Sequence, residues 1–130
     1  RPTSDASSAV NNSSAAQYIG TITTADSATV CDLSVGAFVL GVTLESDDLD
    51  TNGAPTVALN VGDAGSATRY FSASTVAQAG TTAVATAATG LFYTVTGTND
   101  TAVRVAVQAN AATSQDGTVR VAVLYVLPIV

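Results

Sequence analysis

The chain has 130 residues and a formal net charge of −6, with four Arg, no Lys and no His. This length suits one domain, and the lack of clustered cations argues against nucleic acid and against an anionic membrane as partners. Without His or Lys there is no Ser-His pair, no Cys-His pair and no Schiff-base lysine, so the composition argues against an enzyme.

The first sixteen residues are rich in Ser, Ala and Asn and show no hydrophobic periodicity. We expect such a segment to be a flexible arm that only a partner surface would order. The predicted organisation is therefore an N-terminal arm over residues 1–16 and a β-domain over residues 17–130. No apolar run approaches the length of about 18 residues that a membrane-spanning helix needs.

Alternating apolar residues predict strands along the first half of the β-domain. The predicted strands cover residues 18–23, 28–33, 37–44 and 56–61. In the third strand the alternation is expected to put on one face Phe38, Leu40, Val42 and Leu44. In the fourth it is expected to put on one face Val57, Leu59 and Val61.

Cys31 lies in the second predicted strand and is the chain's single cysteine, so it has no partner for an internal disulfide. The favoured interpretation is a small buried apolar residue. The alternatives are a nucleophile or a bridge to another chain, and no His is present to activate the thiol.

The signals for secondary structure are weaker in the middle of the chain and clearest in its last third. Residues 69–71 suggest a short strand, and residues 74–80 suggest one helical turn closed by Gly80. Strands are predicted over residues 91–96, 101–108 and 117–127, with a turn at residues 97–100. The inward side chains of the last two strands are expected to be Val103, Val105, Val107, Val119, Val121, Val123, Tyr125 and Leu127.

Successive strands separated by turn signals predict an all-β fold. Because no helical patterns alternate with the strands, a parallel sheet is not expected. The predicted architecture is a single antiparallel β-sandwich or jelly roll, or a small barrel.

One acidic run resembles the first half of a calcium-binding loop. Asp48, Asp50, Asn52 and Gly53 match the pattern Asp-x-Asp-x-Asn-Gly, in which alternate oxygens converge on a hard cation. The twelfth loop position is Leu59 rather than a bidentate Glu, and strands rather than helices flank the loop. The alternative is a solvated acidic turn, so Asp48, Asp50 and Asn52 are candidate calcium ligands in one of two interpretations.

Arg104 and Arg120 fall on the polar faces of two predicted strands. We expect these two strands to be neighbours, and one register then sets the two guanidinium groups opposite each other. That arrangement would need an acid between them, for example from another chain. The alternative is two solvated arginines.

The carboxyl end is apolar on both faces from Leu124 to Val130, which is unusual for a fraying terminus. Either this segment is a central strand, or one face packs against another subunit. Pro128 would block ladder pairing beyond it. An arm at the other end of the chain could add a strand to a neighbour's sheet. Both ends suit a multi-subunit shell or tube.

Four short motifs resemble a group of small virion proteins of tailed bacteriophages. They are DLDTNGAPT at residues 48–56, VGD at 61–63, STVAQAG at 74–80 and GTVRVAVLYV at 117–126. The resemblance spans residues 37–126. It implies a capsid decoration (cement) protein with a jelly-roll or sandwich fold, a homotrimer bound to the major capsid protein on the outer capsid surface. It implies no catalytic residue, no cofactor and no metal site.

Two other functions remain open from the sequence. One is a tail, neck or fibre component of the same kind of virion, built from the same strands. The other is a calcium-dependent adhesion or carbohydrate-binding module, which depends on the acidic loop described above.

Overall fold

The computed structural model of the protein describes residues 10–18, 27–86, 90–96 and 101–127. These residues form β-strands and one turn of 3-10 helix, so the all-β prediction is confirmed. In chain order the elements are β1 (Val10–Tyr18), β2 (Ser27–Asp32), β3 (Phe38–Ser46), β4 (Ala58–Gly62), β5 (Phe71–Ser74), η2 (Val76–Gln78), β6 (Thr82–Val84), β7 (Tyr93–Thr94), β8 (Ala102–Ala109) and β9 (Gly117–Val126).

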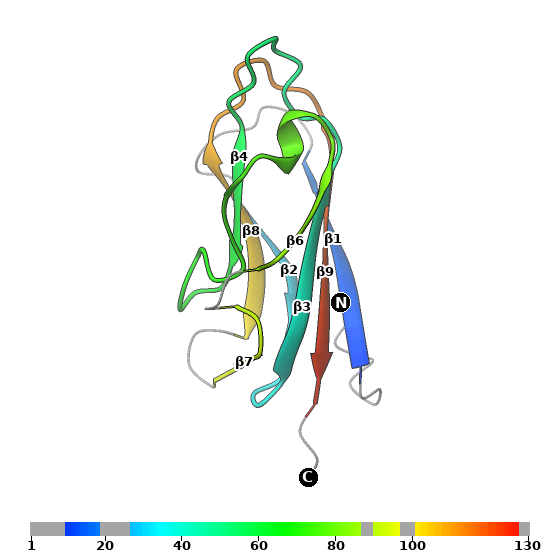
Figure 1. Ribbon diagram of the computed structural model, residues 1–130, viewed down its shortest axis with the longest axis vertical. Coiled ribbons are helices and arrows are strands. Elements are labelled where there is room, and N and C mark those ends of the chain that lie inside the picture. The colour runs from blue at the N-terminus through cyan, green and yellow to red at the C-terminus, as the bar shows by residue number, and fades with distance from the viewer. Residues whose placement is uncertain (1–9, 19–26, 87–89, 97–100, 128–130) are drawn as a thin grey trace.

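The strands form two sheets that face each other across a shared core (Figure 1). Sheet I has the order β1-β9-β3-β6, with the short β7 also paired to β3. Sheet II has the order β2-β8-β4-β5. All of these pairs are antiparallel, as the predicted β-sandwich requires.

The pairing follows one long antiparallel ribbon. The chain doubles back between β4 and β5, and β3 then pairs with β6, β2 with β8, and β1 with β9. Successive rungs of this ribbon lie alternately in sheet II and sheet I. This wrapping is the jelly-roll connectivity, and it makes β8 and β9 inner strands of their sheets although they come last in the chain.

The core consists mainly of Val and Leu side chains from the inner faces of both sheets. In β8 and β9 the predicted alternation is confirmed, because every second side chain is buried and those between are more exposed. The buried members of these two strands are Val103, Val105, Val107, Val119, Val121, Val123 and Tyr125. Branched side chains stiff at χ1 pack well in such a thin double layer.

The prediction that Phe38, Leu40, Val42 and Leu44 share one face is wrong. Val39, Val42 and Leu44 are buried, whereas Phe38 is 37% exposed. The cause is a register shift between Val39 and Gly41 in the pairing of β3 with β9. One extra residue at that point reverses which side chains face the core.

The segments on either side of β6 also differ in detail from the prediction. The helical turn is present as η2, and Gly80 follows it with φ +70°, where a Cβ would lie 2.9 Å from the amide nitrogen of Asp48. The strand predicted over residues 91–96 is reduced to β7, because Phe92 has φ 59° and turns the chain just before it.

Part of the predicted arm is a strand in the structure. Residues 10–16 belong to β1, which pairs along its length with β9 at the edge of sheet I. The division into an arm and a domain at residue 16 stays a prediction. Four predicted features lie outside the described residues: the start of the chain to residue 9, most of the strand at 18–23, the turn at 97–100, and Pro128.

Two matched Leu substitutions test the placement of the core. Leu44 is fully buried between the sheets, whereas Leu124 is 43% exposed on the outer side of β9. We expect Leu44→Ala to lower the free energy of unfolding by about 2–5 kcal/mol and Leu124→Ala by less than about 1 kcal/mol. Urea unfolding of both variants measures the difference, and equal losses would contradict the assigned inner face of β3.

Candidate functional site

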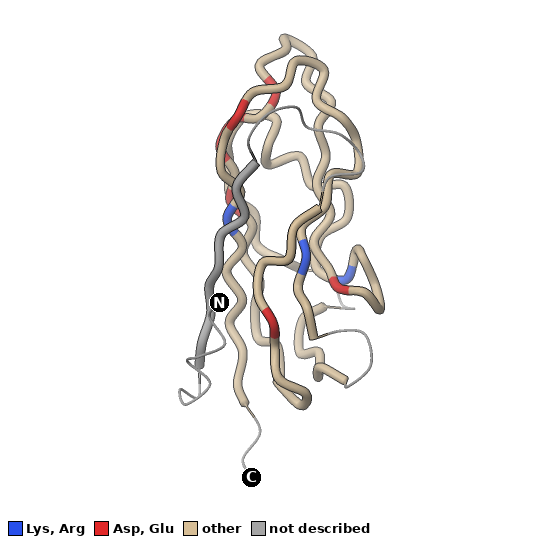
Figure 2. Tube along the Cα trace, turned by 180° about the vertical axis from the view of Figure 1, so that it is seen from behind, with Lys and Arg blue, Asp and Glu red and all other residues tan. Residues whose placement is uncertain are grey.

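Asp50 ties together two loops at one end of the sandwich. This end, formed by residues 47–57 and 110–116, is called the acidic tip (Figure 2). The Asp50 side chain is buried, and its carboxylate accepts five backbone N–H hydrogen bonds from both loops. The donors are Asn52 (3.3 Å), Thr56 (2.7 Å), Val57 (3.2 Å), Ala112 (2.8 Å) and Thr113 (2.8 Å).

These hydrogen bonds set the charge state of Asp50. Burial alone would raise the pKa of this carboxyl group, but the backbone N–H groups of Thr113, Thr56, Ala112 and Asn52 outweigh burial and hold the pKa well below its usual value. An ionised buried carboxylate with this many donors is a structural anchor. It fixes the acidic tip from within.

The candidate calcium ligands lie together in this loop, but their oxygens face backbone donors. Asp48 Oδ1 accepts the N–H of Asp50 at 3.0 Å, and Asn52 Oδ1 accepts the N–H of Ala54 at 2.8 Å. Among the residues that the structure describes, no group of three or more His, Cys, Asp or Glu side chains is placed to hold a metal ion. The geometry therefore favours the acidic-turn interpretation, and calcium binding stays an untested prediction.

Arg104 and Arg120 do not lie on neighbouring strands, so that prediction is wrong. Arg104 is on β8 in sheet II and Arg120 is on β9 in sheet I. Local strand patterns do not reveal that the jelly-roll ribbon sends these two strands into different sheets.

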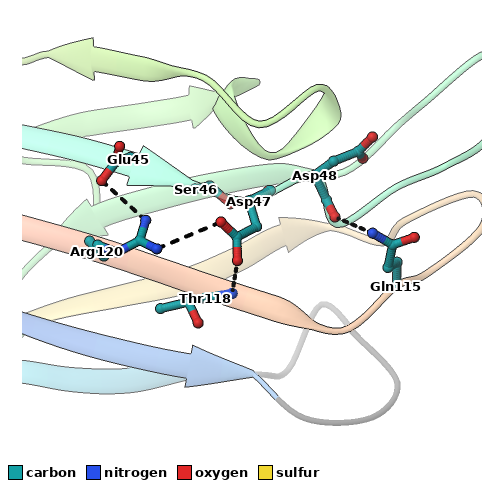
Figure 3. A network of polar contacts seen from close by, with 7 residues as sticks. All are labelled: Glu45, Ser46, Asp47, Asp48, Gln115, Thr118 and Arg120. Atoms are coloured by element: carbon teal, nitrogen blue, oxygen red, sulfur yellow. Dashed lines mark hydrogen bonds and ion pairs between the residues drawn. The ribbon is translucent and has the colours of Figure 1, made fainter.

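Arg120 finds its acidic partners within the same chain. Figure 3 shows Glu45, directly opposite on β3, accepting a hydrogen bond from Arg120 Nη1 at 3.1 Å. Asp47 Oδ1 lies 3.7 Å from Nη2, and its other oxygen accepts the Thr118 N–H at 2.9 Å. These ion pairs are about half exposed, so each contributes little to stability. They do neutralise Arg120 at the border of the acidic tip.

Cys31 has the environment of a structural residue. It is buried in the core on β2 and forms no disulfide. Desolvation by burial, with a smaller contribution from the negative charge of Asp32, raises the pKa of the thiol to about 11. The thiolate is therefore scarce at neutral pH, which supports the interpretation of Cys31 as a buried apolar residue and not as a nucleophile.

The outer face of sheet I carries exposed apolar side chains as well as the Arg120–Glu45 ion pair. Phe38 and Leu124 project outward from β3 and β9, Val84 from β6, and Phe92 from the turn before β7. The Phe38 and Phe92 rings lie 6.1 Å apart between centroids, although Phe92 is 67% exposed. We call these four side chains the apolar face.

Sheet II offers a clear contrast to the apolar face. The large apolar side chains exposed among the described residues are those four and Val35 in the turn before β3, and none comes from a strand of sheet II. Exposed large apolar side chains that gather on one side of a protein often mark interaction sites. The alternation of apolar residues did not predict this face, because the bulge in β3 turns Phe38 outward.

Replacing the anchor carboxylate tests its role. We expect Asp50→Asn to lower the free energy of unfolding by at least about 2 kcal/mol, because an amide supplies one acceptor oxygen for five N–H groups. Asp48→Asn, which affects one accepted hydrogen bond, is the matched control and should cost less than about 1 kcal/mol. Equal effects in chemical denaturation would contradict the anchor.

The same carboxylate predicts a pH dependence. The pKa of Asp50 is lower in the folded than in the unfolded chain, so its contribution is complete above the ordinary value of about 4 and is lost as pH falls further. Melting temperatures measured between pH 6 and pH 2 should therefore fall less steeply for Asp50→Asn than for the wild type. Parallel curves would argue against an ionised Asp50.

Calcium addition tests the remaining interpretation of the loop. If the loop is held by its own N–H groups, millimolar calcium should leave the melting temperature within about one degree of its value in chelator. A rise of several degrees that Asp48→Asn abolishes would establish the metal site instead.

The described residues include no helix whose length and hydropathy would let it cross a bilayer. No protein-family model and no curated protein matches the chain. Solved structures do match it.

A chain in the capsid asymmetric unit of cyanophage Pam1 is 69% identical, with a TM-score of 0.86 over 92% of this chain and 85% of that one. A chain in the capsid of Ralstonia phage GP4 is 30% identical, with a TM-score of 0.68 over 91% of this chain and 86% of that one. A chain in the acid-stable capsid of Helicobacter pylori bacteriophage KHP30 shares the fold at 20% identity, with a TM-score of 0.69 over 94% and 90% of the two chains. The protein therefore belongs to the family of bacteriophage virion structural proteins represented by these chains of the Pam1 and GP4 capsids.

Proposed function

We propose that this protein is a non-enzymatic capsid decoration protein, which binds the outer surface of a phage capsid and bridges major capsid subunits. The observation that carries the proposal is the 69% identity, along almost the whole chain, to a chain of the Pam1 capsid. Its own surface adds support, because Arg69 and Arg120 are paired with acids, Asp50 anchors two loops, and an apolar face is left exposed. Such a surface suits docking better than catalysis.

The apolar face is the part that we expect to contact the capsid. Burying one Leu or Phe side chain contributes about 1.5–3 kcal/mol, so a few such side chains can hold a chain on a surface. The acidic tip would then lie away from the contact or at its rim. Because burying an unpaired charge is costly, a face on which the charged Arg120 is already paired with Glu45 is the better side to bury.

A homotrimer would strengthen this docking without any single strong contact. Three linked copies present three apolar faces, and each bound copy raises the effective concentration of the next. A capsid shell offers repeated sites for such a bridge. The protein would thus reinforce the shell at places where its subunits meet.

The N-terminal segment is the second expected contact. β1 is joined to sheet I by pairing with β9, and residues 1–9 precede it. We expect those nine residues to act as an arm that binds a neighbouring chain, as the composition of the segment suggests. Removing residues 1–9 keeps β1 and should lower capsid affinity while the melting temperature stays unchanged. Unaltered affinity would remove the arm from the mechanism.

Binding to empty capsids tests the proposed function. The purified chain should bind capsids that lack it specifically and saturably, and Leu124→Glu should weaken binding at least tenfold, because a charge would be buried in the interface. Ser72→Glu adds the same charge to an exposed position of β5 in sheet II and should change affinity less than about twofold. Melting temperatures of both variants verify that they are folded.

Of two informative results, the first would contradict decoration and the second would contradict only the contact through the apolar face. The first is absence of saturable binding to capsids together with binding to isolated tails or necks, which would favour a tail, neck or fibre component. The second is an equal loss of binding for Leu124→Glu and Ser72→Glu, which would leave decoration possible but remove the apolar face as its contact.

A further inference from the structure

The outer side of sheet II has a small pocket that the proposed function does not use. Its volume is about 270 Å³, and it lies between β2, β8 and the loop that follows β4. The lining is made of small side chains such as Ala64, Ala67 and Ala106, together with Arg104. Ligand pockets for drug-sized molecules are usually larger, about 300–1,000 Å³, so this one suits a single side chain.

One wall of the pocket is fixed before anything binds. The buried carboxylate of Asp63 accepts N–H hydrogen bonds from Gly65 at 2.9 Å and Ser66 at 2.8 Å, and it pairs with Arg69 Nε at 2.7 Å. Gly62 at the base of the loop has no room for a Cβ, which would collide with the backbone carbonyl of Ser66. The loop is therefore closely packed on its own carboxylate.

The charge of Arg69 is neutralised within this wall of the pocket. Its guanidinium is bound to Asp63 and lies 3.8 Å above the centre of the Tyr93 ring. The negative charge of Asp63, which also lines the pocket, is thereby neutralised. The guanidinium of Arg104 is therefore the charge in the pocket lining that no described group neutralises.

Arg104 differs in this respect from the other arginines that the structure describes. Arg69 is paired with Asp63, and Arg120 with Glu45 and Asp47, but Arg104 makes no hydrogen bond or ion pair with any described residue. It is exposed on an inner strand of sheet II. On a chain with net charge −6, an unpaired guanidinium at a preformed pocket is an evident site for a carboxylate.

Asp32 is the acidic counterpart on the same sheet. It is exposed at the end of β2, an edge strand of sheet II, and it also makes no hydrogen bond or ion pair with a described residue. Its strand pairs with β8, where Asp32 lies opposite Ala102, yet no ion pair forms with Arg104 of the same chain. Both charges are therefore available to another molecule.

We propose that the Arg104 pocket binds the Asp32 carboxylate of a second copy of this chain. Charge complementarity identifies the occupant, because each copy presents one unpaired cation and one unpaired acid on sheet II. Because Arg104 and Asp32 lie on the paired strands β8 and β2, two copies related by a twofold axis can make this contact twice. The proposal does not depend on where in the virion the protein sits, since it concerns contacts between copies through the sheet opposite the apolar face.

A charge-swap cycle tests this contact. Sedimentation velocity and native mass spectrometry of the full chain should show that Arg104→Glu and Asp32→Arg each weaken self-association at least tenfold relative to the wild type. The double variant Arg104→Glu with Asp32→Arg restores opposite charges between copies at an unchanged net charge. It should recover most of the association, and sodium chloride at about 0.5 M should weaken the wild-type association.

A relocated arginine separates the pocket from net charge. Gln108 is exposed on the same strand, four residues or about 13 Å from Arg104. The variant Arg104→Gln with Gln108→Arg keeps the composition and charge of β8 but removes the guanidinium from the pocket lining. It should therefore associate as weakly as Arg104→Gln. Full recovery by relocation would overturn the site.

Three other results would overturn the proposal: a wild-type chain that stays monomeric at millimolar concentration, single variants that associate like the wild type, or a double swap as weak as the single variants. None of these results bears on capsid docking through the apolar face. Loss of capsid binding in Leu124→Glu with unchanged self-association would likewise leave the pocket proposal standing.

Discussion

The alternation of side chains along β9 is the constraint on which the rest of the structure depends. Val119, Val121, Val123 and Tyr125 face the core, and Leu124 faces outward between two of them. β9 lies between β1 and β3 and pairs with both, so it fixes the register of sheet I from the middle. Because a strand has two faces, one set of residues builds the core while the other is free to form a binding surface.

The jelly-roll ribbon turns this local alternation into two different outer faces. β8 and β9 are close in sequence, yet the ribbon sends one to each sheet. As a result Arg104 appears on the outer side of sheet II and Leu124 on the outer side of sheet I. The exposed large apolar side chains of the strands thereby gather on sheet I, and the unpaired Arg104 lies on sheet II.

Much of the fold could be predicted from the sequence because period-two patterns are local. The inward residues of β8 and β9 were predictable from alternation alone, and the turn closed by Gly80 from its position after an apolar segment. The bulge in β3 was not, because one inserted residue leaves the composition of the strand unchanged while it reverses the faces. Phe38 therefore became part of the apolar face and not of the core.

The predictions about the candidate site met a different limit. The acidic run was recognisable as a turn, but the Asp50 partners Ala112 and Thr113 lie more than sixty positions along the chain, where only tertiary structure could supply them. The same holds for Arg120, whose acidic neighbour is Glu45 on β3 and not a residue near Arg104. The residue types were sufficient to predict that these groups would form hydrogen bonds and ion pairs. The identity of their partners depends on the order of the strands in the fold.

The central claim is that the protein works by burying the outer face of sheet I against a capsid. An electron cryomicroscopy reconstruction of capsids saturated with the protein tests it most directly. The account predicts density on the outer capsid surface in which Phe38, Phe92 and Leu124 face the shell and the acidic tip does not. Density with sheet II against the shell, or absence of bound protein, would contradict it.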